Sequence, residues 1–173
     1  ITGNKGKLEE IQKLIPQVEQ LDVDLPEIQS LDSQEVLREK LLVAQKHCKD
    51  AFFVEDTSFT LDGMNGLPGT LSKWFLKSIG NEGVVKLSKI FGTNAQAKSI
   101  IGYSNAEGKI SFFEGVVHGN IVELKGVASK GFGWDPIFKP DGFDVSFGEM
   151  TQDEKNKVSM RRIAVEKLKE VLL

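Results

Sequence analysis

Helical and strand-like spacings of apolar residues alternate along this chain, and that alternation limits its fold more than any other feature. Residues 5–15 (KGKLEEIQKLI) place their apolar side chains on one face of a helix. Residues 17–23 alternate as a strand, and a second helix is expected over 33–49 with Ser33 as its cap. The apolar run at 51–54 (AFFV) then predicts a short buried strand.

The second half of the chain continues in the same manner. The remaining expected elements are helices over 70–79 and 82–91 separated by Gly80, and antiparallel strands over 98–104 and 109–124 joined by the turn NAEGK. This order predicts one α/β or α+β domain over 1–173, with a central mixed β-sheet flanked by helices. The order of the strands within the sheet does not follow from the sequence.

Two features at the chain's ends leave alternatives open. Thr151 and Glu154 match a capping box that would start one long C-terminal helix, but we prefer a short first helix and a break near Ser159. The chain opens at Ile1 as if partway along a truncated strand, so we draw no conclusion about preceding residues.

Composition excludes several function classes. The net charge of −3 disfavours a nucleic-acid binder or a protein attracted to anionic membrane, and no apolar run reaches transmembrane length. The single cysteine, Cys48, forms no intrachain disulfide, which agrees with a reduced, cytoplasmic setting.

The segment TGNKGK at residues 2–7 precedes the first expected helix. It lacks the glycine spacing and the hydroxyl of a P-loop, but exposed amides at a helix start together with lysines can bind an anion. The alternative is a capped helix start with solvated lysines.

Adjacent carboxylates, Glu55 and Asp56, lie where the strand of FFVEDTSF is expected to meet a loop. Neighbours in a strand point to opposite faces, so one of them is expected to face a cleft and the other to be structural. Carboxylates there suit a hard cation such as Mg²⁺, and Glu27 in DLPEIQ could approach Asp56. The alternative is an acidic turn capped by Asp56 or Thr57.

Two further segments could contact a ligand. In SKGFGWDPIF (129–138), Phe132 and Trp134 alternate with glycines, which suits close approach to a flat base but also suits aromatic packing in the core. In KNKVSMRRIA (155–164), four cations lie near Ser159, either as a solvated face or as an anion site.

Together, and in this order, TGNKGK, DLPEIQ, VEDTSF, GLPGTLSKWF, GFGWDPIF and EMTQDEKNKVSMRR resemble the inosine triphosphate pyrophosphatase (Ham1-like) family. The resemblance implies a homodimeric, Maf-like α/β fold whose two lobes surround a nucleotide cleft. It also implies Mg²⁺-dependent (alternatively Mn²⁺-dependent) hydrolysis of ITP, dITP or XTP to the monophosphate and pyrophosphate, which sanitises the nucleotide pool. Water would attack the α-phosphorus and a carboxylate would take its proton.

The resemblance also assigns roles to individual residues. Asp56 is implied as general base and, with Glu27, as metal ligand. The substrate-binding residues implied are Thr2, Gly3, Asn4, Lys5, Lys7, Lys40, Lys73 and Lys155 for the triphosphate, Thr57 beside the substrate, and Phe132, Gly133, Trp134, Asp135, Met160 and Arg161 for the base.

One position departs from the family pattern, which reads Ser-His-Arg where this chain has Ser159-Met160-Arg161. Methionine cannot donate the hydrogen bond of a histidine, so we expect weaker selectivity for a 6-oxo purine with hydrolysis retained. The alternatives are a pyrophosphatase with altered base specificity and a non-catalytic nucleotide-binding protein. Retention of both Glu27 and Asp56 argues against the latter.

Overall fold

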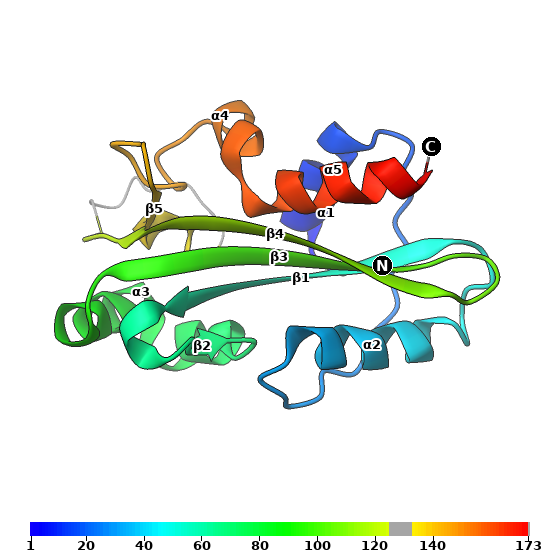
Figure 1. Ribbon diagram of the computed structural model, residues 1–173, viewed down its shortest axis with the longest axis horizontal. Helices are drawn as coiled ribbons and strands as arrows, with labels where there is room; N and C mark the ends of the chain where they lie inside the picture. The colour runs from blue at the N-terminus through cyan, green and yellow to red at the C-terminus, as the bar shows by residue number, and fades with distance from the viewer. Residues whose placement is uncertain (125–132, 173) are drawn as a thin grey trace. The chain divides into compact units, whose positions relative to one another are not determined.

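The computed structural model describes residues 1–124 and 133–172 (Figure 1). Its helices are α1 (Lys5–Leu14), α2 (Ser33–Ala44), α3 (Ser72–Phe91), α4 (Gln152–Val158) and α5 (Met160–Leu172). Its strands are β1 (Phe52–Leu61), β2 (Pro68–Gly69), β3 (Asn94–Ser104), β4 (Ile110–Ile121) and β5 (Phe138–Pro140). Two single 3₁₀ turns are η1 (Asp62–Met64) and η2 (Asp135–Ile137). Within the described ranges, no helix has the length and apolarity needed to cross a membrane.

The strands form one five-stranded sheet in the order β2-β1-β3-β4-β5. Both edge pairs are antiparallel, with Phe59 opposite Gly69 and Asn120 opposite Lys139. β3 and β4 are joined by the expected hairpin, whose turn is closed by hydrogen bonds between Asn105 and Lys109. The sheet is antiparallel where a mixed one was expected, and residues 17–23, expected as a strand, are irregular. The mixed α/β architecture itself is confirmed.

The described chain divides into two compact units, which agrees with the two lobes that the resemblance implies. Unit 1 comprises Ile1–Thr57, Ser99–Gly115 and Met160–Leu173, and unit 2 comprises Ser58–Lys98 and Val116–Ser159. The single domain over 1–173 and the nucleotide cleft stay predictions.

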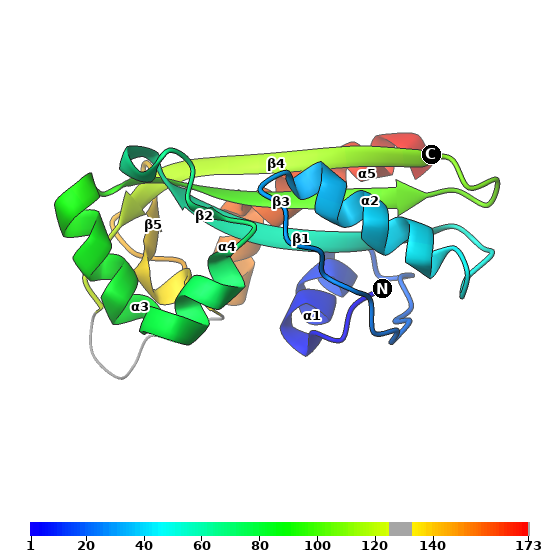
Figure 2. The same ribbon diagram turned by 90° about the horizontal axis from the view of Figure 1, so that it is seen from below.

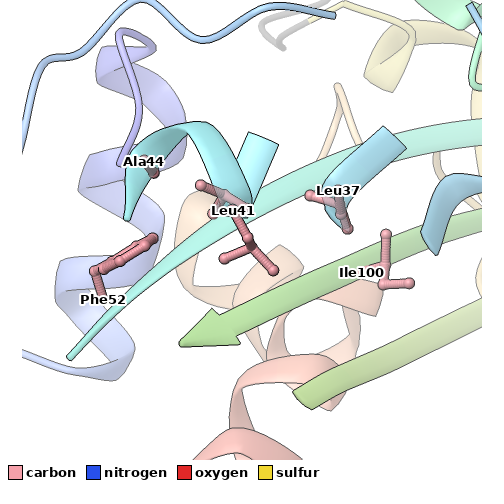
Figure 3. Packing of buried hydrophobic residues seen from close by; sticks show 6 residues of the cluster. Leu37, Leu41, Ala44, Phe52 and Ile100 are labelled. Carbon is pink, nitrogen blue, oxygen red and sulfur yellow. The ribbon is translucent and has the colours of Figure 1, made fainter. Parts of the chain in front are cut away.

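In unit 1, helices cover both faces of the sheet (Figure 1). On one face α2 packs through a cluster that Figure 3 shows from close by, formed by Leu37, Leu41, Ala44, Phe52, Val54 and Ile100. On the other face α1 and α5 pack against each other and the sheet. That second cluster contains Ile15, Ile101, Ala164, Val165 and Leu168. Both faces of the sheet are therefore covered there. This accounts for the adjacent buried residues Ile100 and Ile101 in β3, which belong to the first and the second cluster respectively.

In unit 2, the ribbon of α3 bends (Figure 2). The backbone at Gly80 within this helix is non-helical (φ 64°, ψ −177°). The expected interruption between the two helical segments is thus confirmed. A positive φ is accessible to glycine at little steric cost, which explains why the bend occurs at this residue. The core of unit 2 is aromatic: the Trp134 ring contacts the rings of Phe59, Phe138 and Phe147, and Phe138 also contacts Phe147.

Two helix boundaries refine the expectations. The N-cap of α2 is Asp32, whose carboxylate accepts from the amides of Gln34 and Glu35, so Ser33 is the first helical residue and not the cap. Near the C-terminus, Thr151 and Glu154 form the capping box of the short helix α4. Ser159 is extended and separates α4 from α5, as expected.

Candidate functional site

The first candidate segment, residues 2–7, forms a capped helix start. Asn4 is the N-cap of α1, and its Oδ1 accepts from the Lys7 amide at 3.1 Å. The Asn4 amide in turn donates to Thr2 Oγ1 at 3.0 Å. Gly3 is exposed beside them, whereas the Lys5 side chain lies outside what the structure describes. The segment is therefore a hydrogen-bonded helix N-terminus, which is the geometry that favours an anion.

Lys7 is not one of the solvated lysines that the alternative interpretation required. Its side chain is 13% exposed, and its Nζ lies 3.0 Å from Oε2 of Glu55 and 3.4 Å from the Glu55 carbonyl oxygen. A small cavity of ≈ 20 Å³, room for about one water, is lined in part by these two residues and Thr2. The lysine thus has a buried counter-ion and a little space around it.

Glu55 and Asp56 lie within β1 and not at its end, because the strand continues to Leu61. Glu55 is buried among polar partners. Its Oε1 accepts from Ser99 Oγ at 2.6 Å and from Arg161 Nε at 3.1 Å. Strand alternation predicts that one of the two carboxylates is structural, and these contacts identify Glu55 as that residue.

Asp56 is surrounded by charges of both signs. Burial raises the pKa of its carboxyl, the ammonium groups of Lys7 and Lys40 oppose that rise, and Glu55 and Glu27 add to it. Lys40, buried on α2, pairs with Glu27 at 3.0 Å. The structure thereby brings both predicted metal ligands and two predicted phosphate-binding lysines into one charged neighbourhood, from α1, α2, β1 and the loop before α2.

The predicted base-recognition segment lies in unit 2. Phe132 falls outside the described residues. Gly133 has φ 63°, and its carbonyl accepts from Asn81 Nδ2 at 3.0 Å. Trp134 is 6% exposed and touches the rings of Phe59, Phe138 and Phe147. Aromatic packing, the alternative interpretation, therefore describes Trp134 in this structure, while stacking on a base stays a prediction.

Asp135 and Lys155 form a buried ion pair in the same unit. Lys155 Nζ lies 2.6 Å from Asp135 Oδ2 and 5.8 Å from the ring centre of Phe147. Lys73, by contrast, is exposed, with its ammonium 5.7 Å from the Trp74 ring centre. Of the predicted triphosphate lysines in unit 2, Lys155 is thus buried in an ion pair, whereas the Lys73 side chain is exposed.

The cationic cluster around Ser159 separates into buried and solvated members. Lys155 and Arg161 are buried, whereas Lys157 is exposed and Arg162 is half-buried. Arg161 pairs with Glu10 and Glu55 in unit 1, and burial lowers its pKa to about 10, so it stays charged at neutral pH. The solvated-face interpretation therefore fails for the two buried members.

Met160 opens α5 and is 2% exposed. Its carbonyl oxygen lies against Gly115 of β4, where an added Cβ would come within 2.0 Å of it. The start of α5 is therefore fixed tightly on the sheet, and Arg161 with it.

Sequence reasoning missed Glu10 and Ser99. Glu10 is 7% exposed and binds Arg161, 151 positions later in the chain. The available signal was its position on α1, three residues after Lys7 and four before Leu14, which places it on their face of the helix. Ser99 had no signal, because a serine in an apolar strand pattern identifies no partner.

The family is apparent from comparison with known proteins. A model of the Ham1 family matches residues 1–171. An inosine triphosphate pyrophosphatase of Schizosaccharomyces pombe is 41% identical, covering 99% of this chain and 93% of its own length. An inosine triphosphate pyrophosphatase of Saccharomyces cerevisiae is 37% identical with the same coverage. The solved structure of the Staphylococcus aureus Ham1 protein superposes with a TM-score of 0.80 at 25% identity, covering 99% of this chain and 95% of that chain. This chain belongs to the Ham1 family.

Proposed function

We propose that this protein hydrolyses ITP, dITP and XTP to the monophosphate and pyrophosphate. The observation that carries the proposal is the near-full-length similarity to enzymes named inosine triphosphate pyrophosphatase. The charged neighbourhood of Asp56 supports it, because it combines a carboxylate of raised pKa with two lysines suited to phosphate.

The triphosphate is proposed to bind at the start of α1. Thr2, Gly3, Asn4, Lys5 and Lys7 would supply amides, a hydroxyl and ammonium groups, and the positive end of the helix dipole favours an anion there. Lys40, Lys73 and Lys155 would add positive charge. For Lys40 and Lys155 this requires exchanging a carboxylate partner, Glu27 and Asp135 respectively, for phosphate oxygens.

Asp56 and Glu27 are proposed to hold Mg²⁺, with Mn²⁺ as the alternative ion. The donor set fits, because both are carboxylates and a buried carboxylate of raised pKa gains from a neighbouring cation. Within residues 1–124 and 133–172, no group of three or more His, Cys, Asp and Glu gathers to hold a metal. That agrees with Mg²⁺, which uses one or two carboxylates together with substrate phosphates and waters. When bound, the ion would supply charge stabilisation for the phosphate oxygens.

Hydrolysis is proposed to proceed with Asp56 as general base. Asp56 takes a proton from the water that attacks the α-phosphorus, and the bond from that phosphorus to the bridging oxygen breaks. Its raised pKa brings the carboxyl nearer to the operating pH, which suits a base. Lys7 and Lys40 stabilise the pyrophosphate that departs.

The base is proposed to be read by Phe132, Gly133, Trp134, Asp135 and Arg161, with Thr57 beside the substrate. A guanidinium donates a hydrogen bond to a 6-oxo group but meets the 6-amino group of adenine, itself a donor, unfavourably. Met160 is the position where we expect weaker selectivity, since it offers no hydrogen-bond donor. If methionine in place of the family's histidine at position 160 has altered the base specificity, a modified or standard purine nucleotide would replace ITP as the best substrate.

A panel of nucleoside triphosphates tests the proposal, with pyrophosphate and orthophosphate measured separately. We expect Mg²⁺-dependent pyrophosphate release from ITP, faster than from GTP or ATP, and none from Asp56→Asn. Binding of ITP without release would identify a nucleotide-binding protein instead. Met160→His should raise kcat/KM for ITP relative to ATP, and unchanged ratios would refute the role of Met160.

The cellular setting is part of the same proposal. We propose a cytoplasmic homodimer that sanitises the nucleotide pool and uses neither nucleic acid nor membrane as a partner. The net charge of −3 supports the exclusion of nucleic acid and membrane as partners. Light scattering would test the homodimer, and salt-sensitive binding to duplex DNA would contradict the exclusion of nucleic acid.

A further inference from the structure

Glu55 contacts two of the residues assigned to the nucleotide. Lys7 on α1 is assigned to the triphosphate, Arg161 on α5 is assigned to the base, and both lie against Glu55 on β1. The side chains of Glu55 and Arg161 are 3% and 4% exposed, so their interaction is only weakly screened by solvent.

The two oxygens of this carboxylate are held differently. Oε1 accepts two well-formed hydrogen bonds, from Ser99 at 2.6 Å and from Arg161 at 3.1 Å. Oε2 lies 3.0 Å from the Lys7 ammonium but, among the described residues, accepts no aligned hydrogen bond. The Arg161 side is therefore anchored, whereas the Lys7 side is a loose charge contact beside a small cavity.

From this asymmetry we infer that Glu55 is a specificity-determining positioning residue, which anchors Arg161 through Oε1 and holds Lys7 through Oε2 until a polyphosphate replaces it. The inference rests on the proposed function. Glu55 competes with the triphosphate for Lys7, so it weakens the binding of phosphate alone. At the same time it fixes the guanidinium that distinguishes bases, so affinity depends more on the base than on the phosphate tail.

Glu55→Gln separates this role from a structural one because its expected effects have opposite signs. The amide keeps the shape and can still accept from Ser99, but it loses the charge that retains Lys7. We expect inorganic tripolyphosphate, measured by calorimetry without metal, to bind about tenfold more tightly, the change expected for one charge contact. We expect the preference for ITP over ATP in kcat/KM to fall about tenfold. Structural damage alone would weaken both.

Ser99→Ala is the matched control. It removes a buried hydrogen bond to the same carboxylate and leaves the charge in place. We expect a lower Tm with tripolyphosphate affinity unchanged within twofold. The inference is overturned if Glu55→Gln binds tripolyphosphate with unchanged or lower affinity, or if Ser99→Ala reproduces its tighter binding.

Two further arms keep the test decisive. If Glu55→Gln does not unfold cooperatively, Glu55→Asp replaces it: the shorter side chain withdraws the charge from Lys7, and about threefold tighter tripolyphosphate binding is expected. Unchanged affinity there also overturns the inference. Because tripolyphosphate binding needs no turnover, failure of the wild type to hydrolyse ITP would refute the proposed function without deciding the role of Glu55.

Discussion

Gly115 offers a sharp test of how α5 is positioned. It lies in β4, and a Cβ at this position would meet the carbonyl oxygen of Met160 at 2.0 Å and the amide nitrogen of Ala164 at 2.8 Å. Real Cβ atoms essentially never approach closer than 3.0 Å, so the first contact is 1.0 Å too short. Both atoms are backbone and cannot rotate away. Gly115→Ala must therefore displace the start of α5.

The magnitude follows from this overlap. Overpacking a well-filled site costs about 1–3 kcal/mol, and a backbone obstacle places this substitution near the upper value. For a chain of this size, about 3 kcal/mol lowers Tm by roughly 6–12 °C. A displacement of about 1 Å also moves Arg161 away from Glu10 and Glu55, and misplacement of that size can reduce turnover on the order of 100-fold.

The assay is thermal unfolding followed by circular dichroism, with initial rates of ITP hydrolysis measured well below Tm. Gly6→Ala is the control for stability, because its Cβ would make only an ordinary 3.5 Å contact with Asn4 Oδ1. In α1 that change should leave Tm the same or raise it, by at most about 1 kcal/mol of unfolding free energy. A Tm of Gly115→Ala within 1 °C of the wild type would refute the tight seating of α5.

Three further substitutions test other parts of the structure. Asp56→Asn should abolish turnover yet stabilise the metal-free protein at neutral pH, on the order of 1 kcal/mol or 2–4 °C in Tm, because burial raises the pKa of Asp56 and so penalises its charged form. This gain in stability should vanish near pH 3, where the carboxyl group is protonated in both the folded and the unfolded protein. An equal gain at both pH values would contradict this origin. Hydrogen bonds from Thr151 lower the pKa of Glu154, so their stabilisation is present above the usual value of 4.5 and lost as pH falls through the lowered pKa. The Tm difference between the wild type and Thr151→Ala should therefore narrow between pH 6 and pH 3, and a constant difference would exclude this coupling. Phe147→Ala should lower the unfolding free energy in urea by about 3–5 kcal/mol, since the ring is 1% exposed and packs on Trp134 and Phe138; a loss below 1 kcal/mol would show that the site collapses.

Local signals in the sequence predicted many elements well. The α3 bend at Gly80, the β3–β4 hairpin and the break at Ser159 each depend on residues within a few positions of one another. The strand expected at 17–23 failed for the opposite reason. An alternating pattern is only a strand if a neighbouring edge pairs with it, and the sequence carries no information on that pairing.

The buried charges show the same limit at the candidate site. Strand alternation alone predicts that one of the two adjacent acids, Glu55 and Asp56, is structural. The partners of Glu55, however, come from α1, β3 and α5, and the pair Arg161–Glu10 spans 151 positions. A run of cations such as KNKVSMRR is typical of a solvated face. Only the folded structure shows that its buried members, Lys155 and Arg161, pair with carboxylates from elsewhere in the chain.

The sequence by itself thus determined most of the helices, the β3–β4 hairpin, the acids and cations available, and the family resemblance, because each is carried by local spacing or by motifs. Tertiary structure alone decided which charges pair. It places Lys7 and Arg161 on one buried carboxylate, whereas the Lys157 side chain is exposed. The physical reason is that a buried charge is tolerated only beside an opposite charge, and the fold, through contacts distant in the chain, selects that partner.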